Sequence, residues 1–243
     1  MSAIRDCWLL VSKRGGPLSG ALILTLTGSA ALWAAPPPPA LVDALSDFRT
    51  GGPRGWSYVQ RTEADDGSLL ERYDASQPEA LRWSLLERDG RAPTARETQT
   101  YREGQSRRTA GFGPPRLQDQ FDLTAGEPVS APEGRIAWRF PLKPGGTDDW
   151  SAESLTVTVV LHVATGTIEE VEIASRAPFS PSFAVRIEET RTRMRYSLPI
   201  ENQPSLLQEV SLRLRGTAFW LKSLDQDMVV TYSDYQPPGS RAP

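Results

Sequence analysis

A run of strict alternation is the feature that most constrains how this chain can fold. In residues 155–163 every odd position is leucine or valine, and the even positions hold Thr156, Thr158, Val160 and His162. A two-residue period places successive side chains on opposite faces of a β-strand. The segment is therefore predicted to be a strand with one buried face, and the rest of the chain must supply the sheet around it.

Other segments show the same pattern. We predict strands over residues 56–63, 69–74, 82–88, 121–124, 135–142, 167–175, 185–198, 206–221 and 228–235. Short turns such as Asp65-Asp66-Gly67 and Thr165-Gly166 separate neighbouring segments, which predicts hairpins and an antiparallel meander. Within 185–198 the apolar residues change from odd to even positions, so we expect a bulge near 190–192.

Two helices are expected beside this sheet. Residues 40–49 have apolar side chains at a helical spacing and follow a proline spacer at 36–39. A second helix is predicted after the strand at 82–88, where Thr94 and Glu97 stand at the spacing of a capping box. Gly104 is the expected end of this helix.

Residues 1–35 have the composition of a targeting segment. Arg5, Lys13 and Arg14 precede an uncharged, mostly apolar run over 18–33, and Ser29-Ala30-Ala31 fits a signal-peptide cleavage pattern. We expect a signal peptide and a periplasmic protein. The alternative is an uncleaved inner-membrane anchor with a periplasmic domain. The one cysteine, Cys7, precedes the apolar run, so the exported part has neither a disulfide nor a thiolate.

Composition and motifs give no indication of catalysis. Beyond residue 35 the chain has 24 basic and 29 acidic residues, a net charge of −5, which is not typical of a nucleic-acid-binding protein. His162 is the sole histidine, and no Gly-x-Ser-x-Gly motif is present. The paired glutamates at 169–170 and 188–189 would point to opposite faces of their strands. We therefore expect no enzyme, no cofactor and no metal.

The stretch after the third strand is rich in arginine. Residues 82–116 hold eight arginines and four acidic residues, a local net charge of +4 in an acidic protein. One interpretation is a lid or docking arm that meets anionic groups or an envelope partner. The other is a solvated insertion at about 91–120. The candidate contacts for an anionic group or partner are Arg91, Arg96, Arg102, Arg107 and Arg108.

The order of these elements resembles that of the outer-membrane lipoprotein carriers, the LolA/LolB-like superfamily. The residues that carry the resemblance are 69–90 (LLERYDAS…LRWSLLERDG), 215–235 (RGTAFWLKSLDQDMVVTYSDY) and, within the latter, Ser233-Asp234-Tyr235. It covers most of residues 40–236. It implies a mainly β fold in which one long curved antiparallel sheet forms a half-open barrel, with short helices over the concave face. We expect a disordered tail over 237–243.

The resemblance also implies that the concave apolar face holds an acyl chain, a lipid or a lipidated protein. A curved sheet either fills its apolar face or leaves a cavity for an apolar ligand. The alternative is therefore a structural or protein-interaction module whose face is filled as a core. The candidate lining residues are Trp83, Leu85, Trp138, Phe140, Val157, Val159, Leu161, Leu212, Leu214 and Trp220.

Overall fold

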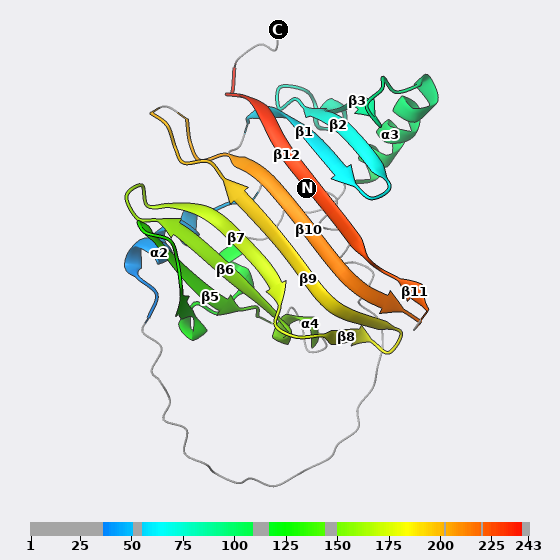
Figure 1. Cartoon of the computed structure of the whole chain (residues 1–243). Helices are drawn as coiled ribbons and strands as arrows, with labels where there is room; N and C mark the ends of the chain where they lie inside the picture. Colours follow the sequence, from blue (N-terminus) through cyan, green and yellow to red (C-terminus); the bar gives the residue numbers. More distant parts are fainter. Residues whose placement is uncertain are drawn as a thin grey trace.

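The fold is a single twelve-stranded antiparallel sheet that does not close on itself (Figure 1). The computed structural model describes residues 36–50, 55–108, 117–143, 150–201, 203–219 and 221–239. The predicted targeting segment 1–35 and the end of the predicted tail, 240–243, lie outside these residues. The mainly β architecture and the open, curved sheet expected from the sequence are confirmed.

The strands follow the predicted segments closely, with three short additions. They are β1 (Ser57–Ala64), β2 (Gly67–Tyr73), β3 (Trp83–Arg88), β4 (Glu127–Val129), β5 (Arg135–Pro141), β6 (Leu155–His162), β7 (Thr167–Ser175), β8 (Phe179–Ser182), β9 (Val185–Tyr196), β10 (Leu207–Ala218), β11 (Lys222–Ser223) and β12 (Gln226–Gln236). The helices are α2 (Pro39–Asp47), α3 (Ala95–Arg108) and α4 (Trp150–Glu153), with 3-10 turns η1 (Glu79–Leu81), η2 (Leu117–Gln120) and η3 (Leu123–Ala125).

The strand order explains why the chain is interrupted after β3. Along the sheet the order is β3-β2-β1-β12-β10-β9-β7-β6-β5-β4, while β8 and β11 pair with β9 and β10. The meander thus has two parts, joined where the first strand pairs with the last. Because β3 and β4 are the opposite edges, the connection over 89–126 must carry the chain from one edge to the other.

Both ends of this connection contribute to the same sheet face. Tyr101 of α3 reaches the carboxylate of Glu71 on β2, and Phe121 stacks on Phe140 of β5 with ring centroids 4.9 Å apart. The two described ends of the connection therefore both lie against the apolar side of the sheet. Of the part between them, 109–116 lies outside the described residues.

Strand register places apolar side chains in continuous rows on one face. One row runs through seven strands: Thr62, Val230, Val210, Met194, Val171, Val159 and Trp138 are successive partners. The opposite face is charged. The residues that alternate with the apolar ones along each strand form ion pairs with neighbouring strands, such as Arg195–Glu209 at 2.6 Å and Arg193–Glu172 at 2.8 Å. The alternation read from the sequence thus separates a core face from a wet face.

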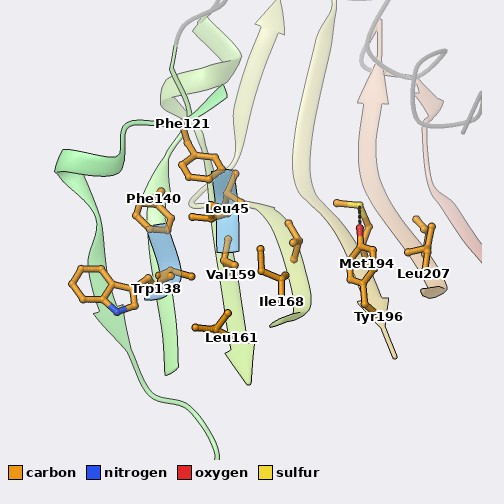
Figure 2. Close-up of a cluster of buried hydrophobic side chains, with 14 of the residues drawn as sticks. Leu45, Phe121, Trp138, Phe140, Val159, Leu161, Ile168, Met194, Tyr196 and Leu207 are labelled. Atoms are coloured by element: carbon orange, nitrogen blue, oxygen red, sulfur yellow. Dashed lines mark hydrogen bonds between the residues drawn. The ribbon is translucent and has the colours of Figure 1, made fainter. Parts of the chain in front are cut away.

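Helix α2 covers the apolar face over β5, β6 and β7 (Figure 2). Leu41 and Leu45 are both fully buried and lie one helical turn apart, so one side of α2 faces the sheet. After the helix ends, Phe48 packs edge-on against Tyr196 with centroids 5.0 Å apart. The helix predicted over 40–49 is confirmed, and it begins one residue earlier, at Pro39.

Four local predictions are wrong. Residues 121–124 are not a strand: Phe121 forms an isolated bridge to Leu142, and Asp122 accepts from the Thr124 backbone and hydroxyl, which turns the chain into η3. The long strand expected over 206–221 ends at Ala218, where a turn leads back to the short strand β11. The β9 bulge lies at Glu188, two residues before the predicted range. Helix α3 continues through Gly104 to Arg108.

The helices of the described part of the chain are all too short or too polar to span a lipid bilayer.

Candidate functional site

The apolar sheet face is closed at one end and partly open at the other. Under α2 the side chains of Phe140, Val157 and Val159 are completely buried, and Trp138 keeps 5% of its surface exposed. At the β3-β2-β1-β12 end, large aromatic side chains line the same face but are only half-buried. This second end is the candidate binding site.

Five aromatic side chains form this site, which we call the aromatic end. Tyr58 lies at its centre, 5.1 Å from Tyr73, 6.0 Å from Trp83 and 5.6 Å from both Tyr232 and Tyr235, measured between ring centroids. Cross-strand pairing produces this cluster, since Tyr73 is the register partner of both Tyr58 and Trp83. Aromatic pairs at these separations stabilise one another and present a wide apolar surface.

A buried polar pair lies beside the aromatic rings. The Gln60 side-chain amide donates to a Glu71 carboxylate oxygen at 2.6 Å, and the Tyr101 hydroxyl of α3 donates to the other oxygen, also at 2.6 Å. Glu71 is 4% exposed and Gln60 is 7% exposed. Gln60 Oε1 is buried and has no hydrogen-bond partner among the residues that the structure describes. Such an acceptor is costly, so it could receive a donor group from a ligand.

Tyr58, Tyr232 and Tyr235 stay neutral, because the pKa of each is raised. Burial raises the pKa of Tyr58 well above the ordinary tyrosine value, and the neighbouring tyrosines and Glu71 raise it further. The pKa of Tyr232 is also raised, first by burial and then by the Glu71 carboxylate. The aromatic end therefore offers the rings and the neutral hydroxyls of these three tyrosines next to the Glu71 side chain.

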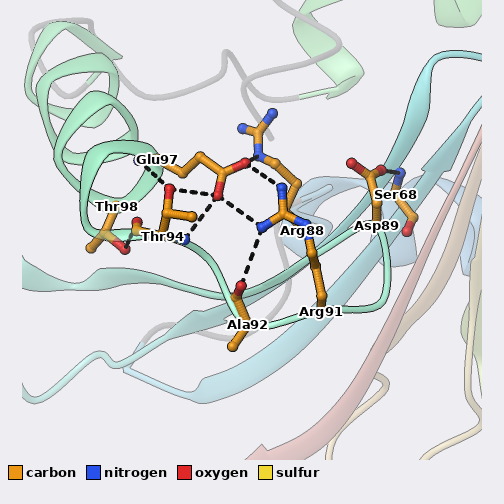
Figure 3. Close-up of polar contacts among 8 residues, drawn as sticks. All are labelled: Ser68, Arg88, Asp89, Arg91, Ala92, Thr94, Glu97 and Thr98. Carbon is orange, nitrogen blue, oxygen red and sulfur yellow. Dashed lines mark hydrogen bonds and ion pairs between the residues drawn. The ribbon is translucent and has the colours of Figure 1, made fainter.

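A charged lock fixes α3 to the sheet edge (Figure 3). The capping box predicted from the sequence is confirmed: the Glu97 N–H donates to Thr94 Oγ1 at 3.3 Å, and the Thr94 N–H donates to Glu97 Oε2 at 2.8 Å. Arg91 donates two hydrogen bonds of 2.8 and 3.0 Å to the Glu97 carboxylate. Arg88 Nε of β3 lies 3.7 Å from Glu97 Oε1. One carboxylate thus joins the helix start to β3.

Protonation of Glu97 is expected to loosen this lock only in strong acid. Hydrogen bonds from Arg91 and then Thr94 lower the pKa of Glu97 to about 2. The contribution of the lock is therefore complete above the ordinary glutamate pKa and disappears as pH falls from about 4.5 towards 2. An NMR titration of the Glu97 carboxyl carbon should show a midpoint near 2. In Arg91→Ala the midpoint should rise, and an ordinary midpoint in the wild type would contradict the lock.

The structure separates the predicted lining residues into groups. Trp138, Phe140, Val157, Val159 and Leu161 are core residues of the closed end, each no more than 5% exposed. Leu212 is buried and Leu214 half-buried on β10, between the two ends. Trp83 belongs to the aromatic end, and Leu85, the register partner of Glu71, is buried beside it. Trp220 lies outside the described residues.

The predicted arginine contacts are also spread out. Arg91 is engaged by Glu97, so its role is in the lock. Arg96 and Arg102 are exposed on α3. Arg107 and Arg108 end the helix, and their side chains lie outside what the structure describes.

Sequence reasoning missed most of the aromatic end. Tyr58, Tyr73, Tyr232 and Tyr235 were placed in strands, but no single strand indicates that β1, β2 and β12 bring them together. The available signal was a pair of large polar residues at inward positions: Gln60 and Glu71 share the strand face of Tyr58 and Tyr73. Polar residues at buried positions are often functional.

No three histidine, cysteine, aspartate or glutamate side chains in the described ranges gather closely enough to hold a metal ion. Comparison with known protein families, characterised proteins and solved structures finds no match to this chain. The resemblance to the lipoprotein carriers therefore stays a prediction.

Proposed function

We propose that this chain is a non-enzymatic binding protein that holds an apolar or amphipathic molecule, such as an acyl chain or lipid, at the aromatic end of the sheet. The observation that carries the proposal is the contrast between the two ends of one apolar face. The side chains under α2 are fully buried or nearly so, whereas the large rings of the aromatic end keep part of their surface exposed. Partly exposed aromatic clusters beside a few polar groups are typical of ligand sites.

The polar pair gives the proposed ligand an orientation. An apolar body would lie on the rings of Tyr58, Tyr73 and Trp83, and a hydroxyl or amine of the head group would donate to Gln60 Oε1 or Glu71. Because Gln60 Oε1 is buried, α3 must shift to admit that group. The Tyr101–Glu71 hydrogen bond links α3 to β2, and α3 presents few apolar residues to the sheet, so the proposed shift disturbs little apolar packing.

The proposed setting is the periplasm, as the composition of residues 1–35 predicts. The second candidate is a structural or interaction module that binds no small ligand, and it is favoured by the closed packing of Trp138 and Phe140 under α2. The two candidates differ in one measurable property, the uptake of an apolar probe.

A fluorescent fatty acid titrated into the purified full chain tests the proposal. We expect saturable binding with an emission shift, and Trp83→Ala should weaken it at least about tenfold, because it removes one wall of the aromatic end. Leu81→Ala is the matched control: Leu81 is an exposed apolar residue two positions before Trp83, outside the cluster. This control should leave the affinity unchanged.

Circular dichroism and thermal unfolding of both variants must show that the fold is kept. The proposal would be overturned if the wild type bound no probe, or if the Trp83→Ala variant bound it as tightly as the wild type. The structural or interaction module would then be the remaining candidate.

A further inference from the structure

A second apolar surface lies at the opposite end of β12 from Tyr235. Phe183 forms the turn between β8 and β9, while Phe219 and Leu221 lie in the turn between β10 and β11. These three side chains are 84%, 65% and 94% exposed. We call them the hairpin-tip patch. Large apolar side chains gathered at one exposed place usually mark an interaction surface.

The two turns that carry the patch are fixed to each other. The Phe219 N–H donates to the Ala184 carbonyl at 2.6 Å, and Val185 and Ala218 are register partners on β9 and β10. Both turns therefore extend the same end of the sheet (Figure 1). The three side chains are presented together on a rigid support and are not scattered over separate loops.

The backbone of this turn supports an outward role for Phe219. Its φ of 50° lies in the left-handed region, which large aromatic residues rarely adopt. Glycine or asparagine would form such a turn with less strain. An exposed phenylalanine in a strained turn gains nothing for folding, so a function of the side chain outside the fold is the better explanation.

The two turns of the patch lie in segments without acidic residues, and the nearest acids in the sequence, Glu188 and Asp225, directly follow these segments. Residues 176–187 and 210–224, which include both turns, contain no aspartate or glutamate, although the whole chain has a net charge of −3. Lys222 is exposed directly after Leu221, and Arg186 is exposed on β9, where it pairs with Glu188 from beyond the first segment. Cations behind large apolar side chains are complementary to an anionic lipid surface.

We propose that the hairpin-tip patch inserts into the interface of an anionic lipid bilayer. Turn tips project outwards, so a planar and deformable bilayer can receive all three side chains without a preformed pocket. Phenylalanine and leucine bury their surface at the acyl boundary, while Lys222 remains at the level of the head groups. The proposal is independent of the ligand site, because the aromatic end lies at the other end of β12.

Sedimentation of the full chain with vesicles of equal parts phosphatidylcholine and phosphatidylglycerol tests the proposal. The test variant is Phe183→Ser, Phe219→Asn, Leu221→Ser, in which asparagine tolerates the left-handed turn. The control variant is Leu81→Ser, Val163→Ser, Ile200→Ser, which removes three other exposed apolar side chains. Both variants keep residues 1–35, so any contribution of that segment to vesicle binding is the same in each.

We expect the tip variant to bind at least about tenfold more weakly than the wild type, and the control variant to bind as the wild type does. Phosphatidylcholine alone should also weaken wild-type binding. Equal binding by the tip variant and the control would overturn the proposal. So would a loss of self-association in the tip variant, seen by size exclusion, with vesicle binding unchanged, since the patch would then contact a second copy of the chain.

Discussion

Replacing Phe140 by alanine is expected to lower the free energy of unfolding by about 3–5 kcal/mol, the usual cost of removing a buried aromatic ring. Phe140 is fully buried, stacks on Phe121 and lies 6.4 Å from the Trp138 ring. Gly126 packs so closely that an added Cβ would collide with the Phe140 ring. The neighbours are thus shaped around this ring, and little can move in to fill the space it leaves.

Urea unfolding followed by circular dichroism measures this loss. The matched control is Arg139→Ala. Arg139 directly precedes Phe140 on β5, and its side chain faces solvent and forms an exposed ion pair with Glu127. Because exposed pairs contribute little, the control should change the unfolding free energy by less than about 1 kcal/mol. A Phe140→Ala cost as small as that of the control would mean that the face under α2 is not a packed core.

Replacing Gly216 by alanine is expected to cost about 2–3 kcal/mol, although only one methyl group is added. The Cβ would meet the carbonyl oxygen of Arg186, a backbone atom that cannot rotate away, and would crowd Ile187. Gly216 faces the β9 bulge, where the pairing steps from Ile187 to Glu189 across the strands. The bulge brings the two backbones together, so only glycine fits opposite it.

Gly104→Ala is the control for this substitution and should act in the opposite direction. Gly104 lies inside α3, and an added Cβ there meets no atom within 4 Å. The alanine should therefore stabilise the helix by about 0.5–1 kcal/mol. Thermal unfolding measures the stability of both variants against the wild type. A Gly216→Ala variant as stable as the wild type would contradict the close approach of the two backbones at the bulge.

The strands could be predicted because alternation is a local signal. A side chain that faces the core on β6 must be followed by one that faces away, so residues 155–163 reveal their structure without reference to any partner. The phase change in β9 also predicted a bulge. Its position was two residues off, because the site of the extra residue is set by Gly216 on the neighbouring strand and not by β9 itself.

Long-range pairing could not be predicted in the same way. No residue of β1 indicates that β12 will be its neighbour, yet this pairing makes β3 and β4 opposite edges, so the interruption after β3 has to link the two edges of the sheet. The same pairing brings Tyr58 to Tyr232 and completes the aromatic end. The site was missed because it is a product of topology.

The start of α3, the helix that follows β3, was predicted correctly, but its end was not. Its start was predicted because Thr94 and Glu97 are three residues apart and their hydrogen bonds are local. Its end was placed wrongly at Gly104, because one glycine costs a helix only about 1 kcal/mol. Contacts that are distant in sequence, such as Tyr101 with Glu71, then help to decide whether the helix persists.

Photo-crosslinking with a diazirine-bearing fatty acid tests the central claim most directly, because it reports where on the sheet an apolar ligand lies. After digestion of the labelled full chain, mass spectrometry should find the label on peptides from β1, β2, β3 and β12, close to Tyr58, Tyr73 and Trp83. Label concentrated on β5 and β6, around Trp138 and Phe140, would contradict the account, because a ligand would then occupy the end of the face that α2 closes.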